Sequence, residues 1–134
     1  MTRAANAAFE SRQAQSETRI VKAIFPNTTN HHNTLFGGQA LSWMDEAAFI
    51  SATRFCRKPL VTVSTDRIDF KEPIPAGTFV ELVARVAQVG RTSLTVRVDI
   101  FIESMYADGQ HQAISGEFKF VAIDDNRRPT PVLD

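Results

Sequence analysis

The sequence has few of the features that indicate a disulfide framework, a metal centre or a nucleic-acid partner. Its single cysteine, Cys56, excludes an internal disulfide and any site with several cysteine ligands. Lys and Arg number 15, as do Asp and Glu, so the net charge gives no indication of a nucleic acid or a membrane surface as partner. No apolar run approaches the roughly 20 residues of a transmembrane helix, and the N-terminus lacks a signal-peptide pattern. We therefore expect a cytoplasmic protein.

The length of 134 residues is that of one domain with a core of workable size. Residues 1–16 are rich in Ala, Gln and Ser and predict an N-terminal arm, either frayed or a short helix laid on a neighbour. Residues 17–134 then form the domain. Within it, residues 18–25 predict a strand, and residues 37–57 predict a helix that ends before Pro59.

The rest of the chain alternates between apolar and other residues in the manner of β-strands. Val61 and Val63 are at odd positions whereas Ile68 and Phe70 are at even ones, which predicts a bulge or bend between residues 64 and 67. Three further strands are predicted around residues 79–86, 94–103 and 114–122, with turns at 73–77, 90–91 and 108–109.

These elements predict an α+β fold in which an antiparallel sheet of about five strands is wrapped around one long helix. A single apolar helix needs cover over much of its circumference, and a curved sheet provides it. The far side of that sheet, together with Trp43 and Ile50 on the polar side of the helix, would remain uncovered. We therefore predict an oligomer.

Asp45 is the most informative residue of the predicted helix. At 100° per residue, it is the only charge on an apolar arc, with Glu46 on the opposite side. The other members of the arc are Leu41, Met44, Ala48, Phe49, Ala52, Phe55 and Cys56. Burying an unpaired carboxylate is unfavourable, so such a residue has a chemical role or a partner from elsewhere. The alternative is a structural Asp, buried and hydrogen-bonded or at a subunit seam. Cys56 itself is a core residue or, alternatively, a reactive thiol.

The segment before the helix is polar and ends in two glycines. The amides around Gly37 and Gly38 have no preceding turn to bond, so they can stabilise an oxyanion; the alternative is that the glycines only permit tight packing. His31 and His32 have no carboxylate at ligand spacing, and we expect no metal site there. Whether one of them lines a pocket stays open.

Several short motifs in order resemble hotdog-fold acyl-CoA thioesterases, both single-domain bacterial acyl-CoA hydrolases and tandem-domain brain-type enzymes. The resemblance extends over about residues 18–132. Its motifs are Asn30-x-x-x-Thr34-Leu35-Phe36-Gly37-Gly38, Met44-Asp45-Glu46-Ala47-Ala48, Val61-Thr62-Val63, Phe70 with Pro73 and Gly77, Val89-Gly90-Arg91-Thr92-Ser93 and Phe118-x-Phe120-Val121-Ala122. Asn33 stands where the family often has glycine, and Asn tolerates a left-handed backbone best after glycine.

The resemblance implies a sheet curled around the helix, dimers that often assemble into hexamers, and active sites at the dimer seam. Asp45 matches the family's base, and direct attack by its carboxylate is the alternative. Asn30 matches a residue supplied by the partner subunit, although it could instead only cap a turn. With Gly38 as an oxyanion donor, these are the predicted catalytic residues. No cofactor is expected, because coenzyme A is part of the substrate.

Substrate contacts are predicted at Phe36, at Gly37 and on the strand after the helix, where Ser64 or Thr62 can bond the water. Coenzyme A brings phosphates, for which Gly90, Arg91, Thr92 and Ser93 at a turn are the first candidates. Arg127-Arg128 and residues 54–58 are further basic candidates; the alternative is that these charges are only solvated.

Two other functions stay open. A hotdog hydratase or dehydratase would pair a His with a carboxylate, but the predicted helix contains no His. A non-hydrolytic acyl-CoA binding or sensing protein would keep the fold without turnover.

Overall fold

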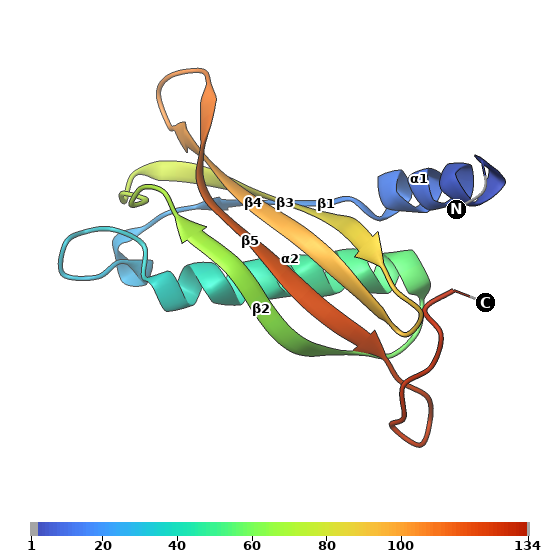
Figure 1. Ribbon diagram of the computed structural model, residues 1–134. Helices are drawn as coiled ribbons and strands as arrows, with labels where there is room; N and C mark the ends of the chain where they lie inside the picture. The colour runs from blue at the N-terminus through green and yellow to red at the C-terminus, as the bar shows by residue number, and fades with distance from the viewer. Residues whose placement is uncertain (1–2, 134) are drawn as a thin grey trace.

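The computed structural model describes residues 3–133, which form two helices and one five-stranded sheet. The elements are α1 (Arg3–Ser16), β1 (Thr18–Ala23), the 3₁₀ turn η1 (Pro26–Thr28), α2 (Gly37–Cys56), β2 (Leu60–Phe70), β3 (Thr78–Val89), β4 (Ser93–Ser104) and β5 (Gln110–Ala122). The strands run in the order β1-β3-β4-β5-β2, and every neighbouring pair is antiparallel. Figure 1 shows α2 along one face of the sheet, with α1 at the end where α2 finishes. The predicted α+β architecture is confirmed.

The core lies between α2 and the facing sides of β3, β4 and β5. Alternate residues of these strands point at the helix and are buried, as their period-two pattern predicted. They are Val80, Leu82, Ala84 and Val86, then Leu94, Val96, Val98, Ile100 and Ile102, then Ile114, Phe118, Phe120 and Ala122. No helix within residues 3–133 has the length and apolarity needed to cross a membrane.

The buried stripe of α2 is rotated from the predicted arc. Its members are Ala40, Met44, Ala47, Ala48, Ser51, Ala52, Phe55 and Cys56. Leu41 and Asp45 are only half-buried, and Phe49 is 45% exposed. The predicted arc was wrong for these three residues because helical periodicity alone does not show where the sheet lies. In the structure, the sheet leaves this flank of α2 partly uncovered.

β2 is an edge strand with two irregularities. Its register against β5 shifts between Asp66 and Asp69, where Arg67 has a φ of 53°, and this confirms the predicted bend. A second shift, between Thr62 and Ser64, was not predicted. Each bulge reverses which side chains face the helix.

The N-terminal segment was predicted to be either a frayed arm or a short helix, and the structure has the second of these. It is a regular helix, α1, held against its own chain: the Phe9 and Phe55 rings are 5.8 Å apart, and Gln13 Nε2 donates to the Val86 carbonyl at 2.7 Å. The strand predicted over residues 18–25 ends at Ala23, and η1 begins at Pro26.

Candidate active site

Asp45 lies on the open flank of α2 and is held by the adjacent strand. Thr62 Oγ1 of β2 donates a hydrogen bond to Asp45 Oδ1 at 3.3 Å. Among residues 3–133 no Lys, Arg or His pairs with this carboxylate. Asp45 is therefore half-buried, hydrogen-bonded and free of a cation, which leaves its second oxygen available to a water molecule or a substrate.

The first bulge of β2 selects Thr62 over Ser64 as the neighbour of Asp45. Thr62 pairs with Phe120, whose side chain faces α2, whereas Ser64 pairs with Lys119 on the exposed side of the sheet. Directly paired residues share a sheet face. The structure therefore turns Ser64 away from Asp45 of its own chain, and of the two predicted alternatives, Ser64 and Thr62, it is Thr62 that lies beside Asp45.

The start of α2 presents unpaired backbone donors. Phe36, at the N-cap, has an extended backbone and no side-chain cap, and its carbonyl accepts from Ala40 N at 3.0 Å. The first amides of the helix, at Gly37 and Gly38, therefore have no partner inside it. Space beside Gly38 is open, while the Phe70 ring of β2 lies 3.7 Å from a Cβ position built on Gly37.

Gly38 and Asp45 lie on the same side of α2. They are seven residues apart, which corresponds to about 10 Å along the helix axis. Side chains of a helix tilt toward its N-terminus, so the Asp45 carboxylate approaches the free amides.

Asn30 organises the loop before α2. Its Oδ1 accepts hydrogen bonds from His32 N at 2.9 Å, Thr34 N at 3.2 Å and Thr34 Oγ1 at 3.1 Å. Asn33 has a φ of 62°, which confirms that asparagine holds the left-handed turn. Asn30 thus caps the turn, as the alternative prediction stated, and this role uses only its Oδ1 atom. Within the described chain, Asn30 Nδ2 has no acceptor and remains free to donate.

His31 and His32 lie at the exposed tip of this loop. Their ring centroids are 3.9 Å apart with the planes tilted by 42°, and no group of three metal-ligating side chains occurs within residues 3–133.

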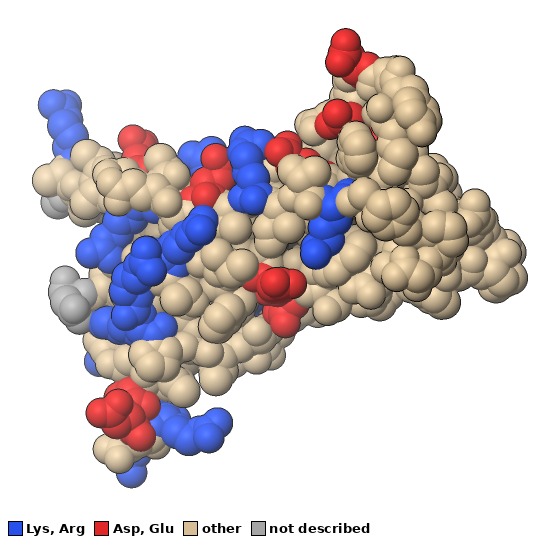
Figure 2. All heavy atoms as spheres, turned by 180° about the vertical axis from the view of Figure 1, so that it is seen from behind, with Lys and Arg blue, Asp and Glu red and all other residues tan. Residues whose placement is uncertain are grey.

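Apolar side chains are exposed around Asp45. Phe49, Val63 and Phe70 are 45%, 50% and 50% exposed, and Phe36 lies exposed at the helix start. On the face in Figure 2, the end with the loop before α2 shows few charged atoms, whereas Lys and Arg gather at the α1 end. Large apolar side chains that remain uncovered around a polar group indicate a ligand or a second chain.

The predicted phosphate turn lines a basic groove of about 920 Å³ between α1, the β3–β4 turn and the C-terminal segment. Gly90, Arg91 and Ser93 line it, and Thr92 completes the turn through its carbonyl, which accepts from Ala122 N at 2.9 Å. Arg12 and Lys119 add two cations that sequence reasoning missed, since only the folded chain brings α1 and β5 to this turn. Among the described residues that line it, none is Asp or Glu.

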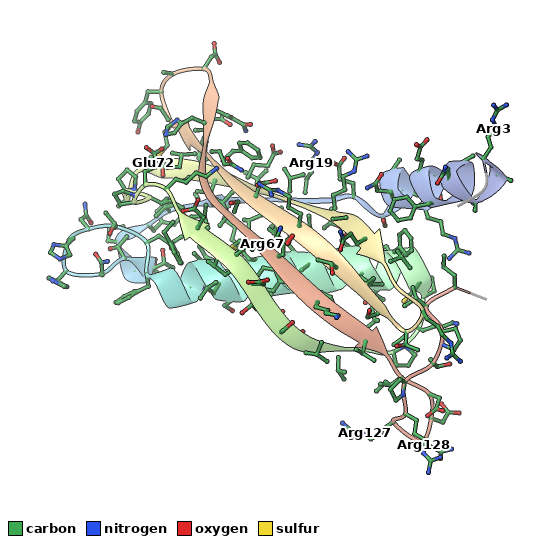
Figure 3. The ribbon with its side chains drawn as sticks, viewed as in Figure 1. Arg3, Arg19, Arg67, Glu72, Arg127 and Arg128 are labelled. Carbon is green, nitrogen blue, oxygen red and sulfur yellow. The ribbon has the colours of Figure 1, made fainter. Side chains whose placement is uncertain are left out.

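The other basic candidates do not line this groove. Arg127 and Arg128 occupy the loop after β5, which projects beyond the sheet (Figure 3). Arg54 Nη1 donates to Thr18 Oγ1 at 3.2 Å, and Lys58 Nζ donates to the Pro131 carbonyl. These two cations therefore support the fold around the end of α2.

The thioesterase superfamily model matches residues 32–107 of the chain. A Bacillus subtilis protein named as an uncharacterized acyl-CoA thioester hydrolase is 42% identical over 118 residues, which are 87% of this chain and 69% of that protein. The crystal structure of an acyl-CoA hydrolase from Bacillus cereus is 37% identical, with a TM-score of 0.87, over 90% of this chain and 74% of its own.

An acyl-CoA hydrolase from Staphylococcus aureus has the same TM-score of 0.87 at 36% identity, over 90% of this chain and 74% of its own. It was solved with butyryl coenzyme A, coenzyme A and coenzyme A disulfide. Variants of it with alanine in place of one aspartate, one threonine or one asparagine have also been solved. Two further similar structures, at 31% and 26% identity, are described as hexameric acyl-CoA thioesterases.

Proposed function

Because the chain belongs to the thioesterase superfamily and has the hotdog fold of its members, we propose that it is an acyl-CoA thioester hydrolase that releases a free fatty acid and coenzyme A. The observation that supports this most is the pairing of Asp45 with Thr62 next to open space and free helix amides. The reaction needs a base that activates water and donors for the carbonyl oxygen, and Asp45 and the helix amides suit these two roles.

Asp45 acts as the general base. Thr62 fixes Oδ1, so the other oxygen accepts a proton from water as that water attacks the thioester carbonyl. The carbon–sulfur bond then breaks, and the coenzyme A thiolate leaves and is protonated. Direct attack by the Asp45 carboxylate, which would give a mixed anhydride that water hydrolyses, is the alternative with the same residues.

The oxyanion is stabilised by the amides of Gly37 and Gly38 together with Asn30 Nδ2 of the partner subunit. The amide group of Asn30 suits this role because its Oδ1 is already occupied within the loop. Phe36 and Phe70 flank these donors and contact the acyl-thioester portion of the substrate. Removing one such donor typically costs about 100- to 1,000-fold in kcat.

The spacing of the three polar residues supports these roles. In the Staphylococcus aureus hydrolase, the substituted asparagine precedes the substituted aspartate by 15 positions, and the substituted threonine follows it by 17. Asn30, Asp45 and Thr62 have the same separations of 15 and 17 positions. We propose that this trio has the same place in the present chain.

The basic groove holds the phosphates of coenzyme A. Arg91, Arg12 and Lys119 supply three cations, and no carboxylate occurs among the described lining residues. Gly90 and Ser93 supply a turn that an anion can approach. Arg12 Nη1 also donates to the Phe55 carbonyl at 3.2 Å, which places the groove at the last turn of α2. Phe55 is about 15 Å from Asp45 along the helix, a distance that the extended pantetheine arm has to bridge.

The active form is a homodimer, and three dimers form a hexamer. Two observations support a second chain at β2: this strand has an unpaired edge, and Val63 and Phe70 are half exposed there. The described hexameric relatives support the larger assembly. The proposed chemistry uses neither a metal nor a separate cofactor, and we propose a cytoplasmic location, where acyl-CoA substrates occur.

The test is a screen of acyl-CoAs of increasing chain length, with free thiol and free fatty acid measured together. Equal amounts of both are expected, and Asp45→Asn should lower kcat by about 100- to 10,000-fold. Glu46→Gln, an exposed carboxylate one residue along α2, is the matched control and should leave kcat unchanged. Enoyl thioester without thiol would identify a hydratase or dehydratase instead. Tight acyl-CoA binding without turnover at any chain length would identify a binding protein.

A further inference from the structure

Gly116 of β5 lies where β5, β2 and α2 meet. Because it has no side chain, a neighbouring side chain can pack directly against its backbone. It is buried on the face of the sheet that covers α2, opposite Val98 of β4. A Cβ atom built on Gly116 would be 2.3 Å from Ile68 Cδ1 and 3.2 Å from Met44 Cε. The Ile68 side chain therefore occupies the place that a side chain at position 116 would take.

The two side chains that converge on Gly116 belong to the two elements of the site. Ile68 lies in the second bulge of β2, next to Arg67 with its positive φ, and this bulge directs Ile68 inward over β5. Met44 directly precedes Asp45 on α2. The same strand and the same helix meet again where Thr62 donates to Asp45.

We propose that Gly116 and Ile68 are positioning residues for thioester hydrolysis. The packing of Ile68 and Met44 over Gly116 sets the separation between β2 and α2 at which Thr62 can hold the Asp45 carboxylate. The proposal rests on the proposed function of Asp45. Neither residue touches the reacting atoms, and each acts through its neighbour on α2 or β2.

The length of the Thr62–Asp45 hydrogen bond makes the site sensitive to this separation. At 3.3 Å the bond is already longer than the usual range for a hydroxyl donor. Closely packed interiors transmit displacements instead of absorbing them, so a methyl group at position 116 must move Ile68, Met44 or both. A further few tenths of an ångström between β2 and α2 would break the bond.

The experiment compares Gly116→Ala with the double variant Gly116→Ala/Ile68→Val, which removes the clashing Cδ1 atom. For Gly116→Ala we expect kcat for acyl-CoA hydrolysis to fall about tenfold with KM changed less than about twofold, the loss expected for one hydrogen bond to a charged group. The double variant should recover most of kcat. Val86→Ala, a buried substitution on β3 two strands away, is the control: it lowers Tm but leaves kcat unchanged where all variants are folded.

A second measurement follows the proximity of Met44 and Ile68 and does not depend on turnover. With ¹³C-labelled methyl groups, the wild-type protein should show a nuclear Overhauser effect between Met44 Cε and Ile68 Cδ1, weakened in Gly116→Ala. An undiminished effect, unchanged kcat in Gly116→Ala, or recovery of Tm but not kcat in the double variant would overturn the positioning role. A wild-type protein that hydrolyses no acyl-CoA would instead overturn the proposed function together with the role that rests on it.

Discussion

β4 and β2 both pair with β5, but they differ in how completely a single chain pairs their edges and buries their side chains. β4 has neighbours on both sides, and its inward side chains from Leu94 to Ile102 are all buried. β2 has one neighbour, two register shifts and large apolar side chains half exposed. The regular strand stabilises the fold, whereas the irregular one places Thr62 and Ile68 against α2. The proposed active site thus lies on the part of the sheet that a single chain leaves incomplete.

The largest effect expected outside the site is on stability, and it should come from β4. Ile100→Ala removes a fully buried side chain and should lower the free energy of unfolding by about 2–5 kcal/mol. Chemical denaturation measures this loss. Turnover per folded molecule should remain at the wild-type value, because β5 separates β4 from β2 in the sheet. A decrease in that turnover would remove the distinction between the two strands.

On β2, two hydroxyl residues two positions apart should behave differently. Thr62→Val removes the hydrogen bond to Asp45 and should lower kcat about tenfold, the lower end expected for a hydrogen bond to a charged group. Ser64→Ala, on the opposite face of the same strand, should change kcat little. Steady-state kinetics of the pair at saturating acyl-CoA decides this. If Ser64→Ala were the more damaging substitution, the bulge would not select Thr62.

The smallest expected effect concerns the basic groove. Arg91→Ala should raise KM for acyl-CoA about fivefold without lowering kcat, since it removes one phosphate contact remote from the reacting bond. The KM of the wild-type protein should also rise with ionic strength, and less steeply in the variant. Arg127→Ala, an exposed arginine outside the groove, is the control. Equal KM values for Arg91→Ala and the wild-type protein would exclude Arg91 from the phosphate site.

Local sequence patterns predicted the parts of the fold that depend on local chemistry. The alternation in β3, β4 and β5 and the glycine and proline limits of α2 were sufficient to place these elements. The burial of Asp45 was overestimated, because the sheet determines which side of α2 is covered. The bulge that turns Ser64 outward depends on the pairing with β5. Likewise, Arg12 and Lys119 join the groove only through tertiary contacts.

The most direct test of the claim that a second chain completes the site uses two inactive variants. Asp45→Asn and Asn30→Ala carry different tags, are expressed together and are purified by both tags. If Asn30 acts on the Asp45 of its partner, each mixed dimer contains one intact site and should show about half of the wild-type kcat. If the mixed dimer is as inactive as either parent, Asn30 and Asp45 act within one chain, and the account is contradicted.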